Sequence, residues 1–167
     1  TARPVGSLKM PLLSRESFRG MCDYINFLHY VQIESSGADI SFAAPLSFNG
    51  TIPEGTVRVR DLFSIYPYEN QLYVMSMTGS EILSYLEYSY SQWIETESEH
   101  LLRIRPGRDE RTGSDSWSFV GRTYNFDSAG GLNYTVDINA PEGQRIRIES
   151  LADGRTFAEP ETYTVAM

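Results

Sequence analysis

The feature that most constrains the fold is a junction near the middle of the chain, where a strand-like segment runs directly into a helix. Leu72 to Met77 has the composition of a β-strand. Thr78-Gly79-Ser80-Glu81 follows and forms a capping box, in which Thr and Glu each satisfy a backbone N–H of the first helical turn. Apolar residues then recur at helical spacing as far as Trp93. This arrangement predicts an amphipathic helix that packs on a β-sheet.

A second helix is predicted from about residue 18 to Gly37, where glycine supplies a left-handed stop. Ser14 and Ser17 are its candidate N-cap residues. His29 lies on or beside the apolar face, where a packed histidine with satisfied hydrogen bonds is expected rather than a ligand. Spacings of three and four place four apolar residues on that face: Phe18, Met21, Ile25 and Leu28.

Further strands are predicted by alternating or continuously apolar runs at 39–44, 134–137, 145–149 and 163–166. Residues 95–115 are highly charged and contain the breakers Pro106-Gly107 and Thr112-Gly113, so a solvated loop is expected there. Helices and strands of mixed spacing indicate an α+β fold, a mixed β-sheet with packed helices. A length of 167 residues is typical of one domain.

Composition excludes several classes of function. A net charge of −8 argues against binding nucleic acid, and no apolar run approaches the ~18 residues needed for membrane insertion. The single cysteine, Cys22, rules out an internal disulfide framework. The only histidines are His29 and His100, and no HExxH, CxxC, GxSxG or phosphate-loop motif occurs. We therefore predict no catalytic residue and no metal site in this chain.

Five short motifs in the first half of the chain carry more than periodicity. The sequence resembles the C-terminal domain of the 5′-nucleotidase family, which includes UDP-sugar hydrolases and 2′,3′-cyclic-nucleotide phosphodiesterases. The order and spacing match, and the likeness extends over essentially the whole chain. The motifs are Ala38-Asp39-Ile40-Ser41-Phe42, Ile52-Pro53-Glu54-Gly55, Asp61-Leu62-Phe63, Tyr66-Pro67-Tyr68-Glu69-Asn70 and Met77-Thr78-Gly79-Ser80-Glu81-Ile82.

The resemblance implies a division of labour in nucleotide catabolism. Residues 1–167 would be a single substrate-recognition domain that holds a nucleotide or nucleoside and has no cofactor of its own. Bond breaking would occur on divalent metals in a metallophosphoesterase domain or protein outside this chain, so this chain alone is expected to be inactive. The family is commonly exported, which implies a location in the periplasm or at the cell surface.

The resemblance also assigns candidate substrate-binding residues. Tyr68 falls on the family's first base-stacking aromatic, although a half-buried structural tyrosine is the alternative. Asn70 falls on an asparagine that reads a base edge or ribose, and it could equally close the turn. Gly130 and Gly131 match a loop that lets backbone approach the substrate, or else a plain strand-entry turn.

Two departures from the family pattern leave a second function open. The Gly-Gly-x-Arg loop is replaced by Leu46-Ser47-Phe48-Asn49, so Asn49 stands where a substrate-binding guanidinium is expected, and Phe48 offers apolar contact instead. The chain ends at Met167, before the family's second stacking aromatic, which suggests a domain truncated at its C-terminus. The alternative is a non-catalytic, stand-alone module that uses the same fold for protein contact or assembly.

Overall fold

The computed structural model describes residues 2–96 and 100–167. Its helical segments are η1 (Ser14–Arg19), α1 (Asp23–Ser36), α2 (Val59–Leu62), α3 (Gly79–Trp93) and η2 (Thr123–Asn125), where η marks a 3-10 helix. The first strands are β1 (Pro4–Leu8), β2 (Leu12–Leu13), β3 (Ile40–Ala43), β4 (Thr51–Ile52), β5 (Gly55–Arg58) and β6 (Val74–Thr78). The later strands are β7 (Ile104–Arg108), β8 (Asp115–Phe119), β9 (Ser128–Gly130), β10 (Leu132–Val136), β11 (Ile146–Leu151) and β12 (Thr162–Ala166).

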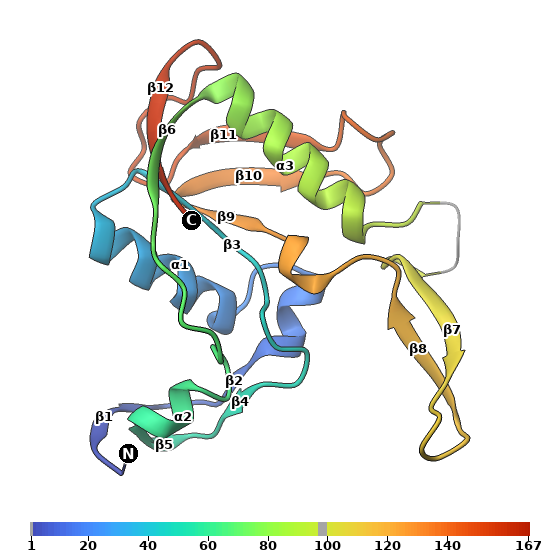
Figure 1. The fold of residues 1–167 in the computed structure, drawn as a ribbon. Coiled ribbons are helices and arrows are strands. Elements are labelled where there is room, and N and C mark those ends of the chain that lie inside the picture. The colour runs from blue at the N-terminus through green and yellow to red at the C-terminus, as the bar shows by residue number, and fades with distance from the viewer. Residues whose placement is uncertain (1, 97–99) are drawn as a thin grey trace.

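A four-stranded sheet with the order β6-β12-β3-β9 lies at the centre of the fold. The sheet is mixed, because β12 pairs parallel with β3 and antiparallel with β6. All four residues of β3 are buried, and they alternate between the two faces. Ile40 and Phe42 pack in the cluster that contains α3, whereas Ala43 packs in the cluster that contains α1. Figure 1 shows α1 and α3 on opposite sides of β3, so the predicted α+β fold is confirmed.

The junction into α3 has the predicted geometry. The backbone N–H of Thr78 donates to the Glu81 carboxylate at 2.8 Å, and the backbone N–H of Glu81 donates to the Thr78 hydroxyl at 3.3 Å. The helix then runs to Trp93. Its inner face is buried over Ile82, Leu86, Tyr90 and Trp93. Local capping and periodicity were therefore sufficient to locate this helix.

The helix predicted to start near residue 18 is in fact two helices. Gly20 has a φ of 140°, which L side chains rarely adopt, and it separates η1 from α1. Phe18 consequently joins the α3 cluster, and Met21 is 48% exposed rather than buried. The predicted end is confirmed, because Gly37 has a φ of 69° and its N–H donates to the carbonyl of Ile33.

The prediction that Ser14 and Ser17 are the N-cap residues of this helix is wrong. Leu13 precedes η1 and Cys22 precedes α1, and neither makes a side-chain cap hydrogen bond. Ser14 and Ser17 both lie inside η1, where the Ser17 hydroxyl donates to the Ser14 carbonyl at 2.5 Å. The Ser17 hydroxyl therefore stabilises the 3-10 helix from within.

The prediction of a loop over residues 95–115 is wrong for β7, which lies inside this segment and forms an antiparallel hairpin with β8, while residues 97–99 of the segment lie outside the described residues. Pro106 lies opposite Trp117 and Gly107 opposite Ser116 in this two-stranded ribbon. A proline is tolerated there because a two-stranded ribbon has only edge strands. The turn contains Gly113 with a φ of 70°. In Figure 1 the hairpin projects from the body of the molecule.

His29 is packed and satisfied, as predicted. It is 3% exposed, and its Nδ1 lies 2.9 Å from the Ser41 hydroxyl while its Nε2 lies 3.0 Å from the Ser128 hydroxyl. Burial lowers its pKa to about 4. The ring thus links α1 to β3 and β9 as a neutral hydrogen-bonding group.

Candidate functional site

A groove of about 920 Å³ lies between α1 and the segment that leads into β6. We call it the α1/β6 groove. Its walls are mainly apolar, with Phe27 and Val31 from α1 on one side and Tyr66, Leu72 and Tyr73 on the other. Asn70 and Gln71 supply polar groups at the same wall. A hollow of this size with few polar groups is typical of a ligand site.

The wall of the groove that contains Asn70 is anchored to the core at Ile65. Ile65 is 1% exposed, and its carbonyl accepts a hydrogen bond from the Tyr24 hydroxyl at 3.1 Å. Burial raises the pKa of Tyr24 to about 12, so this phenol remains a donor. The backbone N–H of Tyr66 donates to the Leu62 carbonyl at 2.9 Å. These two hydrogen bonds fix the position at which the segment after Ile65 begins.

Tyr68 and Asn70 are both exposed, but only Asn70 lines the α1/β6 groove. Tyr68 is 58% exposed, and its ring contacts no other aromatic ring among the described residues. Asn70 donates through Nδ2 to the Tyr66 hydroxyl at 3.1 Å, which closes the turn around the intervening residues. Its carboxamide oxygen accepts no hydrogen bond within the described part of the chain. One polar group therefore remains available at the groove.

The far end of the groove is formed by backbone pairing. Tyr73 and Met167 exchange two backbone hydrogen bonds of 2.9 and 3.0 Å, and Met167 lines the groove. Strand β6 is an edge strand of the central sheet, and Val74 and Met75 are 51% and 42% exposed. An apolar edge of this kind is available for contact with other molecules.

Phe48 and Asn49 lie in the loop between β3 and β4, and neither lines the α1/β6 groove. The Phe48 ring is half exposed and packs 5.4 Å from the Phe18 ring and 5.8 Å from the Phe119 ring, measured between centroids. Asn49 is exposed. The end of this loop packs closely against the segment that precedes the groove wall. A Cβ on Gly50 would lie 2.5 Å from the carbonyl oxygen of Ser64.

Gly130 and Gly131 face the protein interior. A Cβ on Gly130 would lie 2.4 Å from the Cβ of His29, and one on Gly131 would lie 2.2 Å from the Asp39 carbonyl oxygen. Gly131 also has a φ of 82°. Close packing of α1 on β9 and the turn into β10 thus require glycine at both positions, apart from any approach of substrate.

The groove residues of α1 were missed by sequence reasoning. Phe27 and Val31 are 37% and 42% exposed and lie off the buried stripe of Ile25 and Leu28. The signal was their spacing of four, which gives the helix a second apolar face in addition to the core face. A helix that is apolar on two sides has one side available for a ligand, a partner or another segment.

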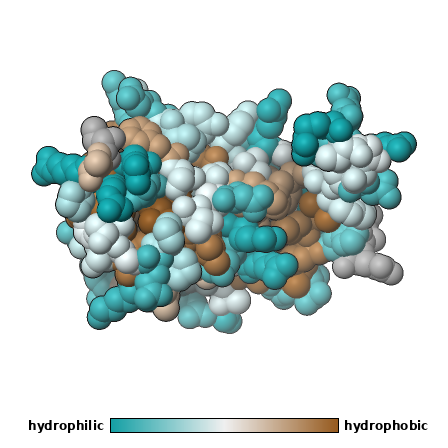
Figure 2. All heavy atoms as spheres, turned by 90° about the horizontal axis from the view of Figure 1, so that it is seen from below, coloured by the Kyte–Doolittle hydropathy of each residue, from teal (hydrophilic) through white to brown (hydrophobic). Residues whose placement is uncertain are grey.

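Two features are absent from residues 2–96 and 100–167. No cluster of three or more His, Cys, Asp or Glu side chains could hold a metal ion within these ranges. No helix formed by the described residues is long and apolar enough to cross a membrane. Viewed from the β1 and α2 side, apolar side chains reach the surface in patches between polar ones (Figure 2).

Comparison with known proteins places these features in a family context. Residues 4–167 match the family model described as 5′-nucleotidase, C-terminal domain. A 2′,3′-cyclic-nucleotide 2′-phosphodiesterase/3′-nucleotidase from Yersinia enterocolitica is 26% identical over 125 residues, which cover 68% of this chain and 18% of the relative. This chain therefore spans less than a fifth of the length of that relative.

Solved structures share the fold. A Staphylococcus aureus protein described as a 5′-nucleotidase, in complex with α-ketoglutarate, aligns with a TM-score of 0.73 and 22% identity, covering 99% of this chain and 31% of that chain. A 5′-nucleotidase precursor from Thermus thermophilus aligns with a TM-score of 0.64 and 21% identity, covering 98% and 29%. In both cases this chain corresponds to less than a third of the larger protein.

Proposed function

Because the chain belongs to the family of 5′-nucleotidase C-terminal domains, we propose that it recognises the nucleoside end of a phosphate ester. The observation that carries this proposal is the exposed, unstacked ring of Tyr68, which lies two residues before Asn70 in the segment that forms one wall of the α1/β6 groove. A base stacked on a phenol ring gains roughly 1–3 kcal/mol and requires no particular sequence of donors and acceptors. The free carboxamide oxygen of Asn70 then accepts from an exocyclic amine or a ribose hydroxyl.

The chemistry is assigned to a different part of the protein machinery. The Yersinia relative is named for phosphodiesterase and nucleotidase activity, and this chain covers only 18% of its length. We place metal-activated attack of water on phosphate in a partnered metallophosphoesterase domain or protein. An exported location, periplasmic or at the cell surface, fits a relative that is described as a precursor.

The binding proposal is tested by calorimetric titration with adenosine, uridine and UDP-glucose. We expect saturable binding of at least one of them, and Tyr68→Ala should weaken it about tenfold or more by loss of the stacking energy. Tyr88→Ala is the matched control, because Tyr88 is 60% exposed and lies on α3, away from the groove. Equal affinity of the Tyr68 and Tyr88 variants would show that the base stacks elsewhere.

The division of labour is tested separately. With divalent metal and 5′-AMP, this chain should release no phosphate above the rate of the metal alone. Robust turnover would contradict the assignment of the chemistry to another domain, whatever the outcome of the binding measurement.

The exposed apolar edge favours a second candidate function, a non-catalytic module for protein contact. Tyr73, Val74 and Met75 at the β6 edge and Phe27 and Val31 on α1 form the supporting surface. The asparagine at position 49 would suit such a role, since no charged group is then held for a substrate. Absence of nucleoside binding, together with concentration-dependent association in sedimentation, would favour this function over the first.

A further inference from the structure

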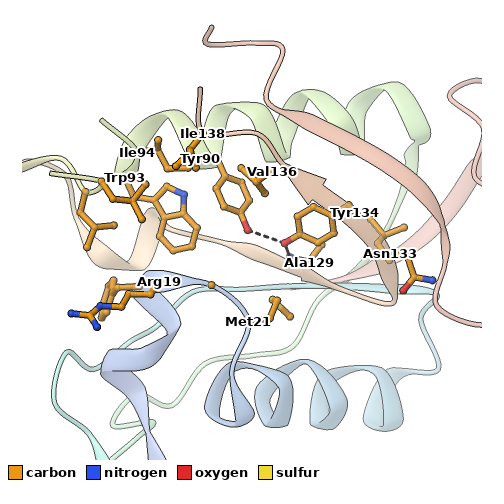
Figure 3. A pocket seen from close by; sticks show the side chains of 15 residues that line it. Arg19, Met21, Tyr90, Trp93, Ile94, Ala129, Asn133, Tyr134, Val136 and Ile138 are labelled. Atoms are coloured by element: carbon orange, nitrogen blue, oxygen red, sulfur yellow. Dashed lines mark hydrogen bonds between the residues drawn. The ribbon is translucent and has the colours of Figure 1, made fainter. Parts of the chain in front are cut away.

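A second hollow, the α3/β10 cavity, lies on the other side of the sheet from the α1/β6 groove. Its volume is about 340 Å³, and the two hollows share no lining residue. Tyr90 and Trp93 of α3 and Leu132 and Tyr134 of β10 form one side, and Met21 lies opposite (Figure 3). The Tyr90 and Trp93 rings are 4.7 Å apart between centroids. The cavity thus offers aromatic and aliphatic walls to an apolar group.

The hydrogen bonds in this wall leave one tyrosine hydroxyl hydrogen without an acceptor. The Ala129 N–H donates to the Tyr134 oxygen at 3.2 Å, and the Tyr90 and Tyr134 hydroxyls lie 2.9 Å apart. Only one of the two hydroxyl hydrogens can lie between the two oxygens, and no described residue accepts the other. Burial raises the pKa of both phenols, so both hydrogens are retained.

Trp93 adds a second unsatisfied donor. It is 4% exposed, and its Nε1–H has no acceptor in the described part of the chain. In Figure 3 the indole nitrogen lies on the side of the ring that faces Tyr90. Leaving a buried donor unpaired costs roughly 1–3 kcal/mol, so a small shift that gives it an acceptor is favourable.

The charge at the cavity also favours a ligand that accepts hydrogen bonds and carries a negative charge. Among the described residues of the lining, Arg19 is the only charged one, and it is exposed at the cavity, on the side opposite α3. Its guanidinium forms no ion pair with the described residues. A protein of net charge −8 therefore has an unpaired cation beside an apolar cavity that contains surplus donors.

We propose that the α3/β10 cavity binds a small aromatic carboxylate. The ring would lie among Tyr90, Trp93 and Leu132, and the carboxylate would accept from the surplus donors and pair with Arg19. Amines are disfavoured because no described residue of the lining carries a carboxylate to receive them. This site is independent of the proposed nucleoside site, since it uses different residues on different elements.

The first test compares three probes of one shape: 2-naphthoate, 2-naphthamide and 2-naphthylmethylamine. Isothermal titration should show saturable binding of the carboxylate at millimolar concentration, with the amide and the amine at least tenfold weaker, because hydrogen bonds to a charged acceptor are the stronger ones. Equal binding of all three, or no saturable binding of 2-naphthoate, would overturn the proposal.

The second test locates the bound probe. The chain has two tryptophans, and Trp117 is 58% exposed on the β7–β8 hairpin, so Trp117→Phe assigns the two indole N–H signals in a ¹H–¹⁵N spectrum. Addition of 2-naphthoate should move the Trp93 signal downfield, as a newly formed hydrogen bond does. A shift confined to Trp117 would place the probe outside this cavity.

Matched charge variants complete the test. Arg19→Gln should weaken 2-naphthoate binding about two- to fivefold, which is the usual contribution of an exposed ion pair. Arg15→Gln removes the same charge from the same 3-10 helix at a residue outside the lining, and it should leave the affinity unchanged. Both side chains are exposed, so neither change threatens folding. An equal effect of the two variants would reduce the role of Arg19 to general electrostatics and contradict its assignment.

Discussion

The neutral ring of His29 should make the stability of this protein depend on pH below neutrality. The Ser41 hydroxyl donates to the Gln32 carboxamide oxygen, so it can only accept from the Nδ1–H of His29. The Ser128 hydroxyl then donates to Nε2 at 3.0 Å. Protonation would turn Nε2 into a donor and force the Ser128 hydrogen toward the Ala43 carbonyl at 3.5 Å. The folded state therefore resists protonation of this ring.

The magnitude follows from the two pKa values. Burial lowers the folded-state pKa from 6.5 to about 4, so the unfolded chain binds more protons between these two values. The free energy of unfolding should fall as the pH is lowered from about 6.5 to about 4, by roughly 3 kcal/mol in total, at about 1.4 kcal/mol per pH unit. Above pH 7 this group should contribute no pH dependence.

Urea unfolding followed by circular dichroism at pH 7, 6, 5 and 4.5 measures this change. His29→Gln should lower stability at pH 7 but flatten the profile between pH 6.5 and 4, because no ring remains to be protonated. His100→Gln removes the other histidine and should leave the slope intact. A proton NMR titration in which the His29 ring titrates near 6.5, or a wild-type profile as flat as that of the variant, would refute the reasoning.

Three further changes have outcomes set by local geometry. Gly130→Ala places a methyl group 2.4 Å from His29, so α1 must move away from β9; a loss of about 2–3 kcal/mol or more in urea unfolding is expected, and a neutral result would show that the helix yields freely. Thr78→Ala removes the α3 cap and should cost about 1 kcal/mol, whereas Thr78→Ser should restore most of it. Asp39 pairs with Arg155, and this pairing lowers its pKa to about 2, so the pair stabilises above pH 3.8 and its contribution is lost as the pH falls toward and below 2. Because the guanidinium is 57% exposed, the ion pair should contribute little, so Asp39→Asn should destabilise the protein modestly at pH 7, in part by weakening the hydrogen bonds from the Thr164 N–H and hydroxyl, and the same unfolding assay should show a smaller cost near pH 2.

What could be predicted from the sequence is what short-range interactions decide. The cap at Thr78, the helix that follows it and the stop at Gly37 each depend on residues within one or two turns, so their signals are complete in the sequence. The β12 strand near the C-terminus was recognisable from its composition alone. The absence of a metal-binding motif and the family resemblance were likewise readable in residue order.

The tertiary structure decided which strands pair and which apolar faces remain open. The break at Gly20 was invisible because spacings of three and four continue across it, and only packing sends Phe18 and Ile25 to different clusters. The β7–β8 hairpin was missed because both its faces are largely exposed, so no alternation between apolar and polar residues is selected. Similarly, Tyr90 meets Tyr134 across 44 residues, through a contact that no local pattern encodes. Binding surfaces arise where long-range packing leaves apolar faces exposed or hydrogen-bond donors unpaired. Which side chains these are depends on the whole fold.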